Sequence, residues 1–99
     1  MAGAVVSLAS GKPVDPKPVL VGSWRAIQRL TVEAASSHRL EQGTVEYCVF
    51  VIEGSGTARI GSRSVGLSQG TGLVLLRGTG ADVTAGERGL EALVVAVNA

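Results

Sequence analysis

Glycine-containing turns recur along most of this sequence and separate short segments of strand-forming residues. From Trp24 onward such turns come about every eight to ten residues, at Gly54-Ser55-Gly56, Gly61-Ser62-Arg63, Ser68-Gln69-Gly70, Arg77-Gly78-Thr79-Gly80 and Gly86–Gly89. No stretch repeats its apolar residues with a helical period. The pattern therefore predicts an all-β fold, either a β-sandwich or a small barrel.

The strongest predicted strand is Thr44–Ile52, which is rich in Val, Ile, Tyr and Phe. Alternation puts Tyr47, Val49 and Val51 on one of its faces and Cys48, Phe50 and Ile52 on the other. Before it, Ser36–Gly43 is polar and is predicted to be a loop. Further strands are predicted at Arg25–Glu33, Thr57–Ile60, Ser64–Leu67, Leu73–Leu76, Ala81–Ala85 and Leu90–Val97.

The first 22 residues differ from the rest of the chain. The segment GKPVDPKPVLVG holds all three prolines, and proline lacks the N–H that a strand ladder needs. Residues 1–22 are therefore predicted to form an extended N-terminal arm, and residues 23–99 a single β-barrel domain.

Composition and charge argue against two classes of partner, nucleic acids and membranes. The net charge is +1, only three residues are aromatic, and no basic run occurs, so the cationic, aromatic surface of a nucleic-acid binder is missing. No apolar run approaches the roughly 20 residues of a membrane span. Because aromatic residues are so few, the core must be built from Val, Leu, Ile and Ala. Cys48 is the only cysteine, which excludes an intrachain disulfide and favours a reducing, cytoplasmic setting.

One long segment carries a family likeness. VEYCVFVIEGSGTARIGSRSVGLSQGTGLVLLRGTG, residues 45–80, resembles the core of the cupin superfamily in its apolar strand, its glycine positions and its strand lengths. The resemblance covers roughly residues 24 to 97. It implies a single-domain, cupin-like jelly-roll β-barrel, in which a ligand can sit inside the barrel.

The chain departs from the family at the metal site. The resemblance implies two histidines near Leu40 and Gln42, a glutamate at Tyr47 and a third histidine at Ala81. None of these ligands is present, so no metal and no other cofactor is expected. Glu46 lies one residue away from the glutamate position and so faces the opposite side from Tyr47 unless a bulge intervenes. An atypical site made of His38, Glu46 and Cys48 is the alternative.

Five residues are candidates for ligand binding. Tyr47 could donate its hydroxyl to a ligand or act as an acid, or it could be a core tyrosine with one hydroxyl partner. Arg59 would favour an anionic ligand if it faces the cavity. Gln42 and His38 could line the mouth, and Trp24 could stack on a ligand or cover one end of the barrel. For Cys48 the simpler interpretation is a buried thiol that behaves as a small hydrophobe.

Three functional hypotheses follow. The first is a metal-free, dimeric cupin-like protein that binds a small organic molecule in the barrel. The second is a small cupin enzyme, such as an isomerase, epimerase, cyclase or dioxygenase of sugar or secondary metabolism, with no catalytic residue assigned. The third is a structural dimerisation module, because both faces of Thr44–Ile52 are apolar and need cover. A barrel interior packed with aliphatic side chains would argue against the first hypothesis.

Overall fold

The protein folds into antiparallel strands. A computed structural model describes residues 7–17 and 22–98, and over these ranges it contains six strands and no helix. The strands are β1 (Trp24–Val32), β2 (Ser37–Leu40), β3 (Val45–Ile60), β4 (Arg63–Ser68), β5 (Gly72–Leu75) and β6 (Ala81–Asn98). The predicted all-β fold is therefore confirmed.

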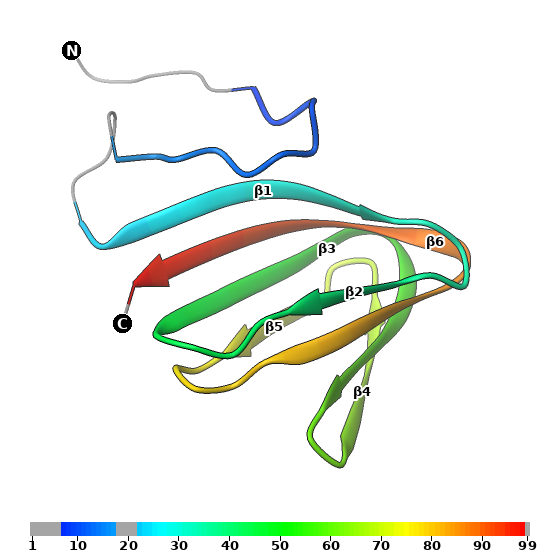
Figure 1. Ribbon diagram of the computed structural model, residues 1–99. Helices are drawn as coiled ribbons and strands as arrows, with labels where there is room; N and C mark the ends of the chain where they lie inside the picture. The colour runs from blue at the N-terminus through cyan, green and yellow to red at the C-terminus, as the bar shows by residue number, and fades with distance from the viewer. Residues whose placement is uncertain (1–6, 18–21, 99) are drawn as a thin grey trace.

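Two long strands organise the molecule. Strands β3 and β6 pair antiparallel along nearly their whole lengths and curve together, as Figure 1 shows. One half of this pair is flanked by β1 and β5, and the other half by β2 and β4. The inner faces of the two halves enclose the core. The pairing order β1-β6-β3-β4 ends in edges, so the sheet is not closed into a barrel.

The core is aliphatic, as the composition predicts. Its buried side chains are Leu30, Val32, Leu40, Val49, Val51, Ala58, Leu67, Leu73, Leu75, Ala81, Val83, Ala85, Leu90, Ala92 and Val94. Among the described residues no polar or charged side chain is buried. Hydrophobic burial of this one cluster is therefore what holds the two halves together.

Three local predictions are wrong. Gly54-Ser55-Gly56 and Gly86–Gly89 are not turns, because β3 and β6 run on through them. A Cβ on Gly54 would lie 2.2 Å from the carbonyl oxygen of Gly89, so these glycines permit a close approach of two backbones where the strand pair bends. Register shifts on both sides of Gly54 accompany the bend. The predicted loop Ser36–Gly43 contains the strand β2.

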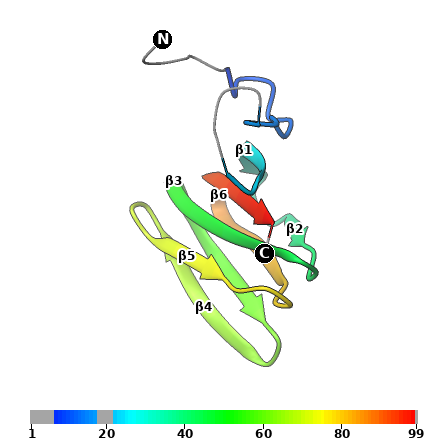
Figure 2. The same ribbon diagram turned by 90° about the vertical axis from the view of Figure 1, so that its left-hand side faces the viewer.

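Part of the predicted arm over residues 1–22 falls within the described ranges. Val14 forms an isolated bridge with Ile27 of β1, and Pro16 is buried. Figure 2 shows these arm residues beyond β1, at the end of the molecule away from β4. In the part of the chain that the structure describes, no helix is long and apolar enough to cross a membrane.

Candidate functional site

The positions of the expected metal ligands are filled by side chains that do not fit a metal ion. Leu40 lies opposite Ala81 in the β2–β6 ladder, and the two residues are 5% and 0% exposed. Tyr47 lies on the same inner face, half-buried against the core, while Gln42 is exposed beyond β2. Two hydrocarbon side chains, a phenol and an amide are not the imidazole and carboxylate set that iron, manganese or nickel takes. These residues therefore do not form a metal site of the cupin type.

The alternative ligands do not come together. His38 lies on the inner face of β2, opposite Val83, whereas Glu46 lies on the outer face of β3 and accepts a hydrogen bond from the backbone N–H of Arg77 at 3.3 Å. Within residues 7–17 and 22–98, no three His, Cys, Asp or Glu side chains are grouped to hold a metal ion. The predicted opposition of Glu46 and Tyr47 is confirmed by the continuous register of β3 with β6 up to Val51.

Cys48 is exposed, so the prediction of a buried thiol is wrong. The reason lies in the sheet: Cys48 pairs with Val74 on one side and Val95 on the other, on a face that no second layer covers within the described chain. Apolar neighbours alone could not reveal that this face is open.

Tyr47 packs at the margin of the core, whereas the register of β1 with β6 puts Trp24 on the outer face of the sheet. The Tyr47 hydroxyl donates a hydrogen bond to the backbone carbonyl of Glu41 at 3.0 Å. Trp24 is half-buried at the start of β1, opposite Val97. Neither residue lines any of the three pockets described below. Their proposed contacts with a ligand stay predictions.

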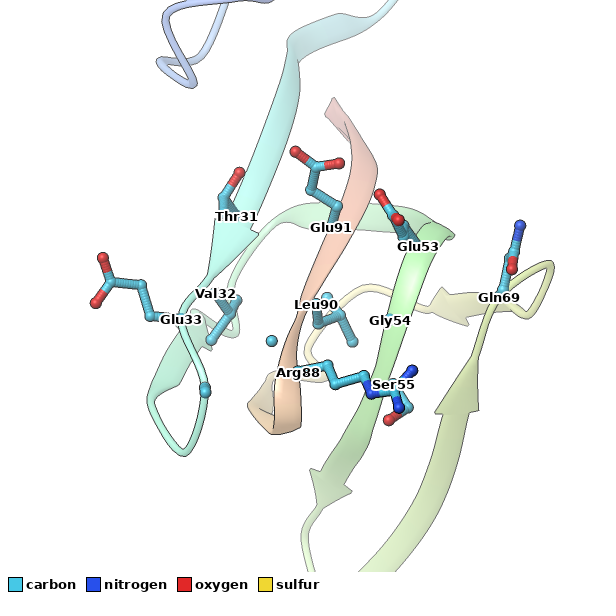
Figure 3. A pocket seen from close by; sticks show the side chains of 12 residues that line it. Thr31, Val32, Glu33, Glu53, Gly54, Ser55, Gln69, Arg88, Leu90 and Glu91 are labelled. Atoms are coloured by element: carbon cyan, nitrogen blue, oxygen red, sulfur yellow. The ribbon is translucent and has the colours of Figure 1, made fainter.

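The largest of these pockets lies where β3 and β6 bend, and we call it the corner pocket (Figure 3). Its volume is about 680 Å³, and it is lined by Thr31, Val32, Glu33, Ala34, Glu53, Gly54, Ser55, Gln69, Arg88, Gly89, Leu90 and Glu91. Glu53 and Glu91 are cross-strand neighbours, and Arg88 extends toward Ser55. Glu91 also binds Arg29 at 2.6 Å. The corner pocket contains none of the five predicted ligand-binding residues.

A second pocket gathers two of the predicted residues. This arginine pocket, of about 400 Å³, is lined by Arg39, Gln42, Arg59, Ile60, Gly61, Gly78, Thr79, Gly80 and Asp82. It lies where β2 ends, β6 begins and β3 turns into β4. Arg39 is a lining residue that the sequence analysis does not predict, because nothing in the local sequence shows that it lies beside Asp82. Only the register, which places Arg39 and Arg59 on either side of Asp82, brings it into the site.

His38 lies in a third pocket, of about 470 Å³, with residues of the arm and of β1. Gln28 crosses this pocket and donates a hydrogen bond from Nε2 to the carbonyl oxygen of Gly11 at 3.0 Å. His38 is thus separated from Gln42 and Arg59, which line a different pocket.

The outer face of the sheet carries a group of exposed apolar side chains. Four large apolar side chains are exposed on or beside it: Phe50 at 48%, Ile52 at 41%, Val74 at 65% and Leu76 at 64%. Cross-strand pairing joins Cys48 to Val74 and Phe50 to Leu93. We call this surface the apolar outer face and define it by Cys48, Phe50, Ile52, Val74, Leu76, Leu93 and Val95.

Comparison with known proteins shows which solved structures share this arrangement of strands. No protein-family model and no curated protein matches the chain. Solved structures of other proteins do match the chain. A cupin protein from Bacteroides fragilis superposes with a TM-score of 0.78 at 14% identity, over 100% of this chain and 86% of that chain. A predicted oxalate decarboxylase from Thermotoga maritima superposes with a TM-score of 0.76 at 16% identity, over 97% of this chain and 100% of that chain.

A third similar structure is the DMSP lyase DddQ from Ruegeria pomeroyi, with a TM-score of 0.68 at 18% identity, over 78% of this chain and 40% of that chain. Proteins described as enzymes therefore occur among those of similar fold. At such low identities a structural likeness shows the fold alone. The expectation drawn from residues 45–80 is confirmed at that level: this chain has the cupin fold.

Proposed function

We propose that this protein acts as a homodimeric module, in which the apolar outer face joins two copies of the chain. The observation that carries the proposal is the contrast between the two faces of β3. Val49 and Val51 are buried in a filled core, while Phe50 on the other face stays 48% exposed. An aliphatic interior with no buried polar side chain among the described residues offers a ligand few groups to bind.

The apolar outer face has the character of an interaction surface. Val74 and Leu76 expose about two thirds of their surfaces, and pairing with β3 and β6 makes the apolar side chains contiguous. The largest contiguous apolar patch on a soluble protein covers a few hundred Å² and is often functional. A single exposed valine would need no such explanation.

Its size suits the centre of an interface. Three strands about 4.8 Å apart, with about five residues along each, span an area on the order of 240 Å². A standard interface buries about 800 Å² per partner and surrounds an apolar centre with a polar rim. The apolar outer face would supply that centre, and the side chains around it would supply the rim.

A second copy of this chain is a partner compatible with the uncharged centre of the apolar outer face. A two-fold interface sets the same patch against itself, so a patch of one charge sign would repel its copy. The seven residues that define the apolar outer face carry no charge at all. Beside it, Arg29 and Glu91 form an ion pair of 2.6 Å, and the carboxylates of Glu46 and Glu53 lie on the same face at its rim.

Sedimentation equilibrium tests the proposal. The wild-type chain is expected at twice its mass of 10.0 kDa, and Val74→Glu at the monomer mass, because burying an unpaired carboxylate at the interface is costly. Val74 is 65% exposed, so the monomer should still fold, as circular dichroism would verify. Ser64→Glu puts the same charge on the exposed β4 and should remain a dimer. A monomeric wild type at tens of micromolar, or a dimeric Val74→Glu, would overturn the proposal.

Binding of a small organic molecule is the second candidate function. The aliphatic core, with no buried polar side chain among the described residues, argues against the interior as the binding site, whereas the arginine pocket keeps Arg59 and Gln42 together. Titration of the protein with small organic acids tests this candidate, as described below. No residue is assigned to catalysis, and a cytoplasmic location stays a prediction.

A further inference from the structure

We infer that the arginine pocket binds a small organic acid through its carboxylate. The inference goes beyond dimerisation, since the pocket shares no residue with the apolar outer face. It begins with a row of charges across three neighbouring strands. Arg39 of β2 pairs with Asp82 of β6, and Asp82 pairs with Arg59 of β3. Side chains opposite one another in a ladder share a face, so Asp82 stands between Arg39 and Arg59 in this row, and its carboxylate is within ion-pair distance of Arg39 alone.

The two arginines of this row differ in their ion pairs. Arg39 binds Asp82 at 3.2 Å and approaches Glu41 at 3.9 Å. Among the described residues Arg59 makes no ion pair, and its one hydrogen bond runs from Nε to the carbonyl oxygen of Gly61 at 3.4 Å. The two terminal nitrogens of Arg59 therefore remain available. Because Asp82 and Glu41 both lie beside Arg39, the positive charge that favours an anion in this pocket is that of Arg59.

The backbone of the neighbouring turn restricts the position of the Arg39 side chain. A Cβ on Gly80 would lie 3.0 Å from a terminal nitrogen of Arg39 and 2.7 Å from the carbonyl oxygen of Leu40. The backbone of this turn therefore packs directly on the guanidinium group. The turn itself is held by a 2.9 Å hydrogen bond from the N–H of Gly78 to the carbonyl oxygen of Gly43. A wall fixed in this way lowers the entropy that binding must overcome.

The chemistry of the lining selects the class of ligand. A guanidinium group presents a planar fork of N–H donors that matches a carboxylate in two parallel hydrogen bonds. Gln42 and Thr79 on the walls add an amide and a hydroxyl group for a further polar group of the ligand. A volume of about 400 Å³ falls at the small end of ligand pockets. A compact organic acid fits these conditions.

Nuclear magnetic resonance titration with malonate tests the inference, at constant ionic strength. Saturable shifts are expected at the backbone amides of Gly61, Gly78 and Gly80 and at the Nε–H of Arg59. Malonamide, which has the same shape without the charge, should leave these signals in place. Equal shifts with malonamide, or no saturable shift with malonate, would overturn the inference. Binding of inorganic phosphate alone would overturn the assignment to a carboxylate.

Two matched variants locate the site. Arg59→Gln should weaken malonate binding at least tenfold, because it removes the available charged fork. Arg63→Gln makes the same charge change at an exposed residue of β4 that does not line the pocket, and should change binding less than twofold. Equal weakening by the two variants would show a general charge effect and overturn the inference. Sedimentation of Arg59→Gln should give the wild-type mass, so failure here is distinguishable from failure of the dimer proposal.

Discussion

Leu40 lies directly opposite Ala81 where β2 pairs with β6, and both side chains are buried in the aliphatic core. The cupin resemblance implies metal-binding histidines at or near these two positions. In this chain the same places are filled with hydrocarbon, and the neighbouring Tyr47 turns its hydroxyl to a backbone carbonyl. The interior that would hold a metal in a cupin here contributes to stability instead.

Leu40→Ala should therefore be strongly destabilising. Leu40 is 5% exposed, and replacing a buried leucine by alanine leaves a cavity that costs about 2 to 5 kcal/mol in the free energy of unfolding. Urea denaturation at one fixed protein concentration measures it. Gln42→Ala, at an exposed position two residues away, should stay within about 0.5 kcal/mol of the wild type. A cost for Leu40→Ala as small as that of Gln42→Ala would show that the interior is not packed.

Transition metals should not stabilise the protein. A metal that binds the native state alone at 100 times its dissociation constant adds about 2.7 kcal/mol to the free energy of unfolding. Because His38 and Glu46 lie on different faces and different strands, we expect the melting temperature to be unchanged by zinc, nickel or manganese, and equally by a chelator. A metal-dependent rise that disappears in His38→Ala would restore the atypical site.

The bend of the strand pair should depend on the missing Cβ of Gly54. Gly54 and Gly61 both have positive φ, 84° and 61°, so alanine at either position costs about 1 to 2 kcal/mol of backbone strain. Only at Gly54 would the new Cβ collide with a backbone, at 2.2 Å from the Gly89 oxygen, whereas Gly61 faces open space. Gly54→Ala should lose a further 1 to 3 kcal/mol or so, measured by urea denaturation. Equal losses would mean that the two backbones can move apart freely.

The same glycines show how far the sequence could predict this fold. The strand content, the family likeness and the alternation around Tyr47 depend on local patterns, and the structure agrees with them. A Gly-Ser-Gly segment has the composition of a turn, but here Gly54 admits the backbone of Gly89. That neighbour comes from another strand, more than thirty residues along the chain. No local pattern contains this information.

The candidate site was harder to predict for a related reason. Arg59 and Gln42 were identified as single polar residues, but their neighbour Arg39 became visible only through the register of β2 with β6. The exposure of Cys48 is a similar case. Apolar residues on both faces of a strand show that both need cover, but not whether the chain supplies that cover itself.

Tyr47→Phe should be almost neutral for stability. The substitution removes one hydrogen bond, from the hydroxyl to the carbonyl oxygen of Glu41, and such a bond contributes about 0.5 to 1.5 kcal/mol. Because the bond is exposed to solvent, a loss at the low end is expected in urea denaturation. Tyr47→Ala also removes the ring that packs on the core and should cost about 2 kcal/mol or more. If Tyr47→Phe lost malonate binding with its stability intact, the hydroxyl would be a ligand contact instead.

The reactivity of Cys48 should report the proposed dimer directly. Cys48 is the only cysteine and is exposed in the single chain, so a chromogenic disulfide reagent gives one signal from the middle of the apolar outer face. In dilute solution, where the chain is monomeric, the thiol should react quickly. At concentrations where sedimentation gives the dimer mass, its neighbours Val74 and Val95 would be covered, and the reaction should slow as protein concentration rises. Val74→Glu, expected to stay monomeric, should react quickly at every concentration. A thiol that reacts equally fast in the dimer would place the interface on another surface of the molecule.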